Sequence, residues 1–532
     1  MPQQIILLSG RVGSGKTTLA DQLVETFDLT LFKTRAFLKE RARGIPAERG
    51  ALQDFGERLD KKTGGAWVQE DLQAAADKLT TDSVIVIDAV RMLGQVEGIR
   101  RAYGRRVFHV HLEASDDELA RRYKNRPSDD IKELPSYADV QRNRTERNVP
   151  KLAKVADVVI RTDRCTRQDV LVRVASHLGL YGREYLRLVD VLVGGQYGSE
   201  GKGQVSAYLA PEYDLLIRVG GPNAGHKVYE EPKPYAFHQL PSGTRACEAK
   251  VLIAAGAIIS ADIIMREIGD CVVGRERLFI DPQAMIIDPQ DRENEAELVK
   301  RIGSTGQGVG QATARRILRG QSVRLAKDVP ELKPYIRPGR EVLEKAFREH
   351  ERVFLEGTQG TGLSLYHGHY PHVTSRDTTV AGCLAEAGIS PTRVRKVILV
   401  CRTYPIRVQD GTKGTSGYMS SEITWEEVAN RSDHDVAELK EAERTTTTNR
   451  QRRVAEFDWH LLRMAATLNA PTDIALTFVD YIAKSNTEAR RFEQLTPETI
   501  RFVEEIEKVA SCPVTLISTR FHSRSIIDRR MW

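Results

Sequence analysis

The chain has 532 residues, with 79 Lys and Arg against 73 Asp and Glu, and this length exceeds one ordinary domain. A net charge of only +6, spread along the chain, argues against sequence-specific nucleic-acid binding and suits anionic small substrates. The absence of any apolar run of about 18 residues and of metal-type cysteine spacing predicts a cytoplasmic protein with reduced thiols, in the host cytoplasm if the source is viral.

The first predicted element is a nucleotide-binding loop. An apolar strand at 5–8 leads into GRVGSGKTT (10–18), and the residues that follow have helical spacing. In such a P-loop, backbone amides surround the phosphates, the lysine contacts the terminal phosphates, and the first threonine binds Mg²⁺. The expected ATP-binding residues are Gly10, Gly13, Ser14, Gly15, Lys16, Thr17 and Thr18.

Two later strands place charged side chains near this loop. One ends at Asp88 and continues to Arg91, and a carboxylate at that end of a parallel strand can orient Mg²⁺ or a substrate group. It can also be an ordinary strand-end aspartate. The next strand precedes a helix with Arg121 and Arg122, followed by Arg126, which could close over phosphates or form a solvated face.

Together these elements resemble the small nucleoside monophosphate kinases of the P-loop class, over about the first 175 residues. The resemblance implies a monophosphate acceptor, for which Arg35 and Arg41 are candidates on the helix where such kinases hold it. Glycine-marked turns near residue 180 indicate a domain boundary. We therefore expect a kinase-like domain over 1–180 and a second domain over 188–532.

A second glycine-rich loop opens the C-terminal part. An apolar strand at 189–193 leads into GGQYGSEGKGQ (194–204), a pattern typical of phosphate binding at a helix N-terminus. Further along the chain follow GGPNAGH, FHQLPSG, GSTGQGVGQ, EGTQGTGLSLYHGHYPHVTSRDTT, YPIRV and TTTNRQRR. In this order the motifs resemble those of adenylosuccinate synthetases of compact archaeal size, from about residue 188 to the C-terminus.

This resemblance implies a ligase that uses a nucleoside triphosphate to phosphorylate the C6 oxygen of a purine nucleotide, after which L-aspartate displaces the phosphate. N1 must lose its proton while Mg²⁺ and cationic groups neutralise the donor phosphates. It also implies a homodimer, because Arg319 matches the arginine that reaches into the neighbouring subunit's site. We expect α/β folds, each a mainly parallel sheet flanked by helices, since apolar runs alternate with helical segments.

The same resemblance assigns roles to individual residues. The catalytic candidates are the loop residues Ser199 and Lys202, the acid His226, and Gln359. The expected aspartate clamp consists of Thr447, Arg450 and Arg452, because guanidinium forks suit carboxylates.

The resemblance also assigns the nucleotide and metal sites. The acceptor nucleotide candidates are Asn223, Thr305, Arg319, Gln359, Thr374 and the backbone at Val408. The donor nucleotide candidates are Gly198, Gly201, Lys202, Gly203, Phe478, Asp480 and Ser518. The Mg²⁺ candidates in this domain are Ser199 and the carbonyl of Gly225.

One departure from the family pattern concerns the acceptor. Ordinary members carry an aspartate in GDEGKG as the base for N1 and as a Mg²⁺ ligand, whereas here the residue is Ser199, whose hydroxyl is far too weakly acidic for that role. A carboxylate at N1 would crowd the 2-amino group of guanine, and a serine leaves room for it. Serine here also marks the phage branch that joins aspartate to dGMP, making N6-succino-2-amino-2′-deoxyadenylate for 2-aminoadenine genomes.

A second departure concerns the phosphate donor. Members that use GTP read guanine with a lysine in TKLD, and here the segment is TFVD, with Phe478 at the lysine position and Asp480 retained. The guanine pocket is therefore in doubt. ATP or dATP becomes an alternative to GTP as the donor.

Three other interpretations stay open at this stage. Ser199 could be tolerated in an ordinary synthetase that uses IMP and GTP for AMP biosynthesis. Loss of the base could instead mark a purine nucleotide sensor without activity, or the kinase alone could turn over. The intact lysine, histidine, glutamine and arginine positions favour an enzyme, and a fused kinase suits a pathway whose product must become a triphosphate.

Overall fold

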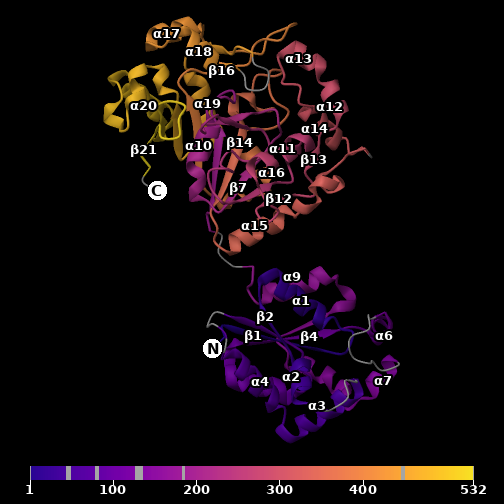
Figure 1. Cartoon of the computed structure of the whole chain (residues 1–532). Helices are drawn as coiled ribbons and strands as arrows, with labels where there is room; N and C mark the ends of the chain where they lie inside the picture. Colours follow the sequence, from indigo (N-terminus) through magenta and orange to yellow (C-terminus); the bar gives the residue numbers. More distant parts are fainter. Residues whose placement is uncertain are drawn as a thin grey trace. The chain divides into compact units, whose positions relative to one another are not determined.

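The computed structural model describes residues 2–42, 49–77, 79, 83–125, 136–181, 186–320, 322–444 and 450–530. The chain folds into two compact units, Met1–Arg183 and Glu184–Trp532 (Figure 1). In the described ranges, every helix is too short or too polar to cross a membrane. Both units consist of a mainly parallel sheet with flanking helices, which confirms the predicted fold class.

The N-terminal unit is built on a parallel sheet of five strands in the order β2–β3–β1–β4–β5. Side chains of the first strand are buried on both faces: Ile5 and Leu7 pack into one core cluster, and Ile6 and Leu8 into another. This is the pattern of a strand covered on both sides by helices. The strands are β1 (Gln4–Gly10), β2 (Thr30–Lys33), β3 (Val84–Asp88), β4 (Val107–Glu113) and β5 (Val158–Arg161).

Helices cover both faces of this sheet. Figure 1 shows α1 (Lys16–Phe27) and α9 (Arg167–His177) on one side of the strands, and α4 (Ala66–Ala76) on the other. The apolar residues of these helices fill the corresponding clusters. The remaining helices of this unit are α2 (Thr34–Arg41), α3 (Arg49–Thr63), α5 (Leu93–Tyr103), α6 (Asp116–Lys124), α7 (Tyr137–Arg142) and α8 (Arg144–Asn148).

The C-terminal unit contains a nine-stranded sheet in the order β12–β10–β7–β14–β6–β15–β19–β20–β21, in which only β21 runs antiparallel to its neighbour. The strands are β6 (Val189–Gly194), β7 (Leu215–Arg218), β10 (Lys250–Ile253), β12 (Leu278–Ile280), β14 (Val353–Gly360), β15 (Val394–Arg402), β19 (Asp473–Thr477), β20 (Val514–Ser518) and β21 (Ile526–Asp528).

Smaller sheets and helices surround this sheet. The short strands are β8 (His226–Val228) with β9 (Tyr235–Phe237), β11 (Ile258–Ile259) with β13 (Met285–Ile286), and β16 (Ile406–Arg407), β18 (Arg453–Ala455) and β17 (Glu422–Ile423). The helices are α10 (Lys202–Leu209), α11 (Ala261–Cys271), α12 (Pro289–Asn294), α13 (Ala296–Ile302), α14 (Val309–Ile317), α15 (Gly339–Arg348), α16 (Val380–Ala387), α17 (Trp425–Ser432), α18 (Val436–Ala442), α19 (Trp459–Asn469) and α20 (Pro497–Ala510).

The centre of the large sheet positions the second glycine-rich loop. β6 lies between β14 and β15, and all three strands run parallel. The loop therefore leaves β6 at the edge where the carboxyl ends of its neighbours also meet. Hydrogen bonds join these segments: Thr477 Oγ1 donates to the Glu200 carbonyl at 2.7 Å, and Thr361 Oγ1 donates to the Gly194 carbonyl at 2.8 Å.

Candidate active sites

The P-loop between β1 and α1 holds its lysine inside the loop. Lys16 Nζ donates to the carbonyls of Gly10 and Arg11, each at 2.8 Å. The loop enters α1 through Gly15, whose φ of 96° is left-handed and favours glycine. The ammonium thus lies where the loop would surround the donor phosphates.

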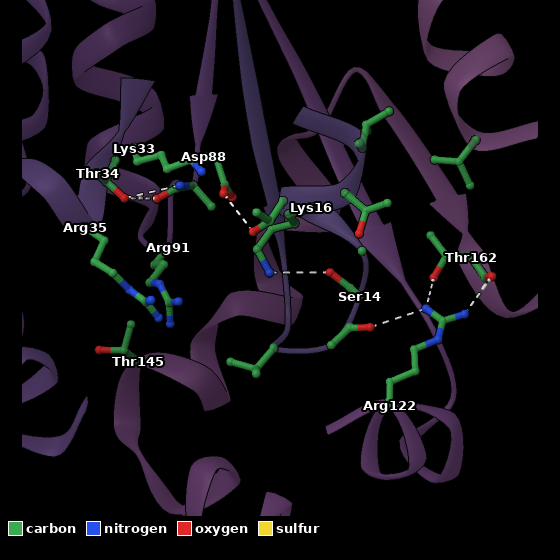
Figure 2. A pocket seen from close by; sticks show the side chains of 18 of the residues that line it. Ser14, Lys16, Lys33, Thr34, Arg35, Asp88, Arg91, Arg122, Thr145 and Thr162 are labelled. Carbon is green, nitrogen blue, oxygen red and sulfur yellow. Dashed lines mark hydrogen bonds between the residues drawn. The ribbon is translucent and has the colours of Figure 1, made fainter. Parts of the chain in front are cut away.

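A threonine and an aspartate meet beside this lysine. Thr17 Oγ1 donates to Asp88 Oδ2 at 2.9 Å (Figure 2), because β3 pairs with β1 in a register that sets Asp88 opposite Leu8. Hydroxyl and carboxylate oxygens are the donors that Mg²⁺ prefers, and one or two protein ligands are usual when phosphates supply the rest. These residues therefore fit the Mg²⁺ that the P-loop implies.

A cavity of about 850 Å³ surrounds the P-loop. Predicted residues that line it are Gly13, Ser14, Gly15, Lys16, Thr17, Thr18, Arg35, Asp88, Arg91 and Arg121. Arg122 also lines it, and its Nη1 reaches the Gly13 carbonyl at 3.3 Å and Thr162 Oγ1 at 2.9 Å.

Three other predicted residues of the kinase-like domain are not among the described residues that line this cavity. Gly10 is one of them, and its carbonyl accepts Lys16 Nζ. Arg41 is absent from the lining, and its Nε donates to Asp71 Oδ2 at 2.9 Å. Arg126 lies outside the described residues. In the described residues, α6 carries Arg121 and Arg122 and ends at Lys124.

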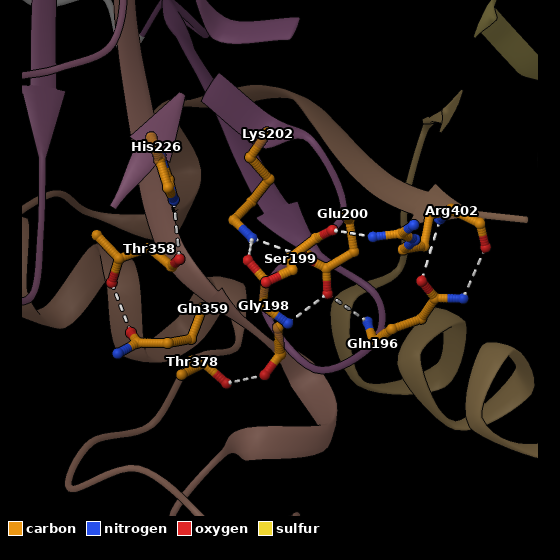
Figure 3. A network of polar contacts seen from close by, with 12 residues as sticks. Gln196, Gly198, Ser199, Glu200, Lys202, His226, Thr358, Gln359, Thr378 and Arg402 are labelled. Atoms are coloured by element: carbon orange, nitrogen blue, oxygen red, sulfur yellow. Dashed lines mark hydrogen bonds and ion pairs between the residues drawn. The ribbon is translucent and has the colours of Figure 1, made fainter. Parts of the chain in front are cut away.

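The second loop encloses a buried ion pair. Lys202 Nζ lies 2.6 Å from Glu200 Oε2 and donates to the Gly198 carbonyl at 2.9 Å (Figure 3). Glu200 also accepts the amides of Gln196 and Gly198, at 3.0 and 2.8 Å. Burial raises the pKa of Glu200, but Lys202, together with the Gly198 amide, outweighs burial and holds the pKa below its usual value. The carboxylate therefore stays ionised and shapes the loop.

A histidine lies close to this loop on β8, held from both sides. His226 Nδ1 lies 2.5 Å from Glu356 Oε1, and Nε2 donates to the Thr358 carbonyl at 3.0 Å. Glu356 also accepts the Ser242 hydroxyl and amide, at 2.5 and 2.7 Å. Burial and the nearby Arg218 lower the pKa of His226. Glu356 thus fixes the orientation of the ring. Glu356 was not predicted from the sequence, although a carboxylate inside an apolar strand often indicates a functional residue.

A second cavity, of about 260 Å³, opens beside the loop. It brings together residues that lie far apart in the chain, and the predicted ones are Gly198, Ser199, Asn223, Gly225, Thr305, Gln359, Thr374, Val408, Arg450 and Arg452. Gln359 Nε2 donates to Thr374 Oγ1 at 3.4 Å, whereas Asn223 Oδ1 is buried without a partner among the described residues. A buried, unpaired amide oxygen suits a ligand that supplies a donor.

The oxygen donors at this cavity fit a magnesium ion only in combination with phosphates. The Ser199 hydroxyl and the Gly225 carbonyl are hard, uncharged donors. Glu295 also lines the cavity, but it accepts the amides of Gly308 and Gly310 at 2.8 and 2.9 Å. Within the described ranges, no three His, Cys, Asp or Glu side chains cluster as a metal site.

Among the predicted donor residues, Phe478 packs against the loop at Gly201. A Cβ added at Gly201 would lie 3.4 Å from the Phe478 ring. Asp480 is buried, and burial raises its pKa to about 7. Ser518, at the end of β20, donates to the Arg520 carbonyl at 3.2 Å.

Arg402 is a further charged residue at this place that sequence reasoning missed. Its guanidinium carbon lies 4.1 Å from the centroid of the Phe478 ring, and its Nη1 donates to the Ser199 carbonyl at 3.2 Å. Its position at the carboxyl end of β15 was the available signal, since ligands of parallel sheets bind at these ends.

Several predicted residues of the ligase site are not among the described residues that line the second cavity. Lys202 and His226 make the contacts given above instead. Thr447 lies outside the described residues. Arg319 follows α14 on the surface, with a φ of 55°, beside the exposed side chains of Ile317 and Leu318.

Comparisons with known proteins place this geometry in a family. The sequence model of adenylosuccinate synthetase matches residues 191–329 and 322–487. The chain belongs to the adenylosuccinate synthetase family. The family's synthetase from Thermococcus onnurineus is 38% identical over 348 residues, which are 64% of this chain and 98% of that protein. The prediction of a carbon–nitrogen ligase in the C-terminal part is thereby confirmed.

Solved structures of the family agree. The succinoaminodeoxyadenylate synthetase of cyanophage S-2L, bound to dGMP and dATP, has a TM-score of 0.55 and 25% identity, over 65% of this chain and 96% of that chain. Adenylosuccinate synthetase of Plasmodium falciparum has a TM-score of 0.56 over 64% of this chain and 100% of that chain. At 20% sequence identity, this similarity supports the fold only. In the N-terminal unit, the AAA domain model matches residues 6–148, in agreement with a P-loop domain.

Proposed function

We propose that the C-terminal unit joins L-aspartate to C6 of dGMP, giving N6-succino-2-amino-2′-deoxyadenylate at the expense of a nucleoside triphosphate. The observation that carries the proposal is Ser199, which lines the second cavity at the place of the family's aspartate base. The neighbouring Glu200 cannot replace that base, because its oxygens are occupied by Lys202 and two loop amides. The dGMP in the cyanophage relative supports the same acceptor.

The first chemical step forms a phosphate ester on the purine. The C6 oxygen attacks the terminal phosphorus of the donor while N1 releases its proton to water, and the bond to the departing nucleoside diphosphate breaks. Lys202, held by Glu200 and the Gly198 carbonyl, stabilises the negative charge on the transferred group. Mg²⁺, when bound, supplies further positive charge to the donor phosphates.

The second step replaces phosphate with the amino acid. The aspartate amine adds at C6 and gives up a proton to water, and phosphate leaves with the electron pair of the C–O bond. Glu356 holds Nδ1 of His226, and when Nε2–H turns from the Thr358 carbonyl to the ligand, the ring donates this proton to the departing oxygen. Arg450 and Arg452 line the same cavity and bind the aspartate carboxylates.

The donor site favours ATP or dATP over GTP. Phe478 replaces the lysine that reads guanine in other members, and Arg402 stacks on its ring.

Arg319 lies beside two exposed apolar residues and reaches the site of a second subunit in a homodimer.

In the N-terminal unit, Lys16, Thr17 and Asp88 support a kinase that transfers a phosphoryl group from a nucleoside triphosphate.

One alternative has an observation in its favour. The archaeal adenylosuccinate synthetases reach 38 and 39% identity, against 25% for the cyanophage structure. This favours an ordinary synthetase that uses IMP and GTP, in which Ser199 is tolerated.

A product assay with IMP and dGMP competing in one tube separates the two functions. The protein is incubated with Mg²⁺, L-aspartate and ATP or GTP, and the adducts are identified by mass spectrometry. A succino-adduct of dGMP is the expected result. Adenylosuccinate alone would overturn the dGMP proposal, and binding of nucleotides without either adduct would indicate a sensor.

A further inference from the structure

The cavity around the P-loop has a second side that the nucleotide donor does not account for. Figure 2 shows Arg35, Arg91 and Thr145 on one side of Lys16, and Arg122 and Thr162 on the other. Among its described lining residues, the cavity has eight Lys or Arg and four Asp or Glu. Its volume of about 850 Å³ lies at the upper end of ordinary ligand pockets, so two ligands can be held together.

Two arginines on the second side form a place for a phosphate. The guanidinium groups of Arg35, on α2, and Arg91, after β3, extend toward the same space (Figure 2). Arg91 is anchored by an ion pair with Glu146, which is buried, and its amide donates to Gln95 Oε1 at 2.8 Å. An anchored guanidinium fork next to a second one suits the oxygens of a dianionic phosphate.

A buried aspartate on α3 supplies a different kind of contact at the same cavity. Asp60 is 5% exposed, and its Oδ1 accepts both Trp67 Nε1, at 2.7 Å, and Gln95 Nε2, at 3.0 Å. In the part of the chain that the structure describes, no hydrogen bond reaches Oδ2. Burial raises the pKa of this carboxyl group. A carboxylate oxygen that lines a cavity and has no donor can accept N–H groups, so this position favours a ligand that offers them.

We infer that this second side binds a purine nucleoside monophosphate with a 2-amino group as the phosphoryl acceptor, its phosphate between Arg35 and Arg91 and its N–H edge at Asp60. The inference rests on the proposed kinase function. The Oδ2 atom can accept two N–H groups, as guanine offers at N1 and the 2-amino group, whereas adenine offers only its 6-amino group on this edge. Leu38 adds apolar surface to the cavity.

The phosphoryl transfer at this site needs no general base. An oxygen of the acceptor's 5′-phosphate attacks the terminal phosphorus of the donor, and the bond to the donor's diphosphate breaks. Two nucleoside diphosphates result, and the attacking oxygen is already ionised at neutral pH. Lys16 and the arginines stabilise the charge of the transferred group.

The test is an acceptor panel for the full-length protein with ATP and Mg²⁺, without L-aspartate. The acceptors are dGMP, 2-amino-dAMP, dAMP, dCMP, dTMP and a non-nucleotide hydroxy acid such as shikimate, and products are separated by chromatography. We expect kcat/KM for dGMP, which offers N–H groups at N1 and at the 2-amino group, to exceed that for dAMP and the pyrimidines by about tenfold or more, and 2-amino-dAMP, which lacks the N1 proton, to fall between dGMP and dAMP. A Lys16→Ala variant, which lacks the P-loop lysine, is the negative control for kinase activity.

Two pairs of variants locate the contacts. Asp60→Asn keeps an acceptor for Trp67 and Gln95 but presents an amide group in place of Oδ2, so KM for dGMP should rise about tenfold while KM for ATP stays constant. Arg35→Ala should raise KM for every nucleotide acceptor. The matched controls are Asp54→Asn, on the exposed face of α3, and Arg41→Ala, on α2. Both should leave KM for dGMP and KM for ATP unchanged.

The outcomes separate this inference from the kinase proposal. Equal or faster phosphorylation of pyrimidine monophosphates or shikimate would overturn the acceptor inference and leave the kinase proposal standing. An unchanged KM for dGMP in Asp60→Asn would also overturn it. If no acceptor is phosphorylated although ATP binds, the kinase proposal itself fails, and the inference fails with it.

Discussion

Glu443 Oε1 lies 2.7 Å from Arg402 Nη2, in an ion pair that is buried on both sides. The other oxygen of the same carboxylate lies 3.2 Å from Nη1 of Arg452, which lines the second cavity. Burial raises the pKa of Glu443, but the two arginines outweigh burial and hold the pKa below its usual value. One ionised carboxylate therefore connects the Phe478 side of the phosphate loop, through Arg402, to the expected aspartate clamp.

Neutralising Glu443 should weaken aspartate binding. In Glu443→Gln the side chain keeps its shape but no longer holds Arg452 by charge, so we expect KM for L-aspartate to rise about tenfold, equivalent to about 1.4 kcal/mol. Steady-state kinetics with varied aspartate measure this. Glu422→Gln, which breaks the half-exposed pair with Arg453, is the control. If Glu443→Gln unfolds at a lower temperature but keeps a normal KM for L-aspartate, the role of Glu443 is structural only.

Asp480 should make stability depend on pH. Its pKa in the folded protein is about 7, raised chiefly by burial, with Arg402 lowering it and Glu443 raising it. Because the unfolded chain ionises near pH 4 and the folded chain near pH 7, stability falls as pH rises through this window. Asp480→Asn removes the effect, so the variant should gain about 3 kcal/mol over the wild type between pH 5 and pH 8. Thermal unfolding at both pH values measures the gain, with the exposed Glu493→Gln as control.

A parallel loss in both proteins as the pH rises would contradict the assignment to Asp480. A difference that appears only below pH 4 would contradict it as well, since the group would then titrate near its ordinary value.

Lys202 should contribute to catalysis beyond its pairing with Glu200. Lys202→Met leaves Glu200 buried without its cation, so folding and activity should both suffer. The double variant Lys202→Met with Glu200→Gln removes the unpaired charge and should recover the unfolding temperature. We expect its ligase activity to stay at least about 100-fold below the wild type, because the transferred phosphoryl group loses its cation. Recovery of activity in the double variant would show that the lysine serves only to balance Glu200.

The sequence was sufficient for the parts of both sites that depend on local pattern. Glycine-rich loops after apolar strands predicted the P-loop and the loop around Lys202, and the ordered motifs predicted residues such as Asn223 and Gln359 that the fold brings to one cavity. Arg35 and Arg41 were indistinguishable in the sequence because both are arginines of one helix. They differ in the structure because six residues turn a helix to another face, where Asp71 binds Arg41.

The contacts that depend on the meeting of distant segments were beyond sequence reasoning. Glu443 is one of many charged residues in its segment, and only the position of the end of β15 sets it against Arg402. Asp60 shows no motif either, because its partners Trp67 and Gln95 come from α4 and α5. Such pairings arise from packing between elements, for which spacing along the chain carries no signal.

Replacing Ser199 by aspartate should exchange the acceptor. A carboxylate at this position restores a base for N1 of hypoxanthine and crowds the 2-amino group of guanine, so Ser199→Asp should raise the IMP rate and lower the dGMP rate, each by tenfold or more. The competition assay with mass-spectrometric detection measures both rates in one reaction. Ser199→Ala, which also leaves room but offers no hydrogen-bond acceptor, should still prefer dGMP, with a higher KM. If Ser199→Asp leaves the ratio of the two products unchanged, the residue does not select the acceptor, and the preference must come from elsewhere in the cavity.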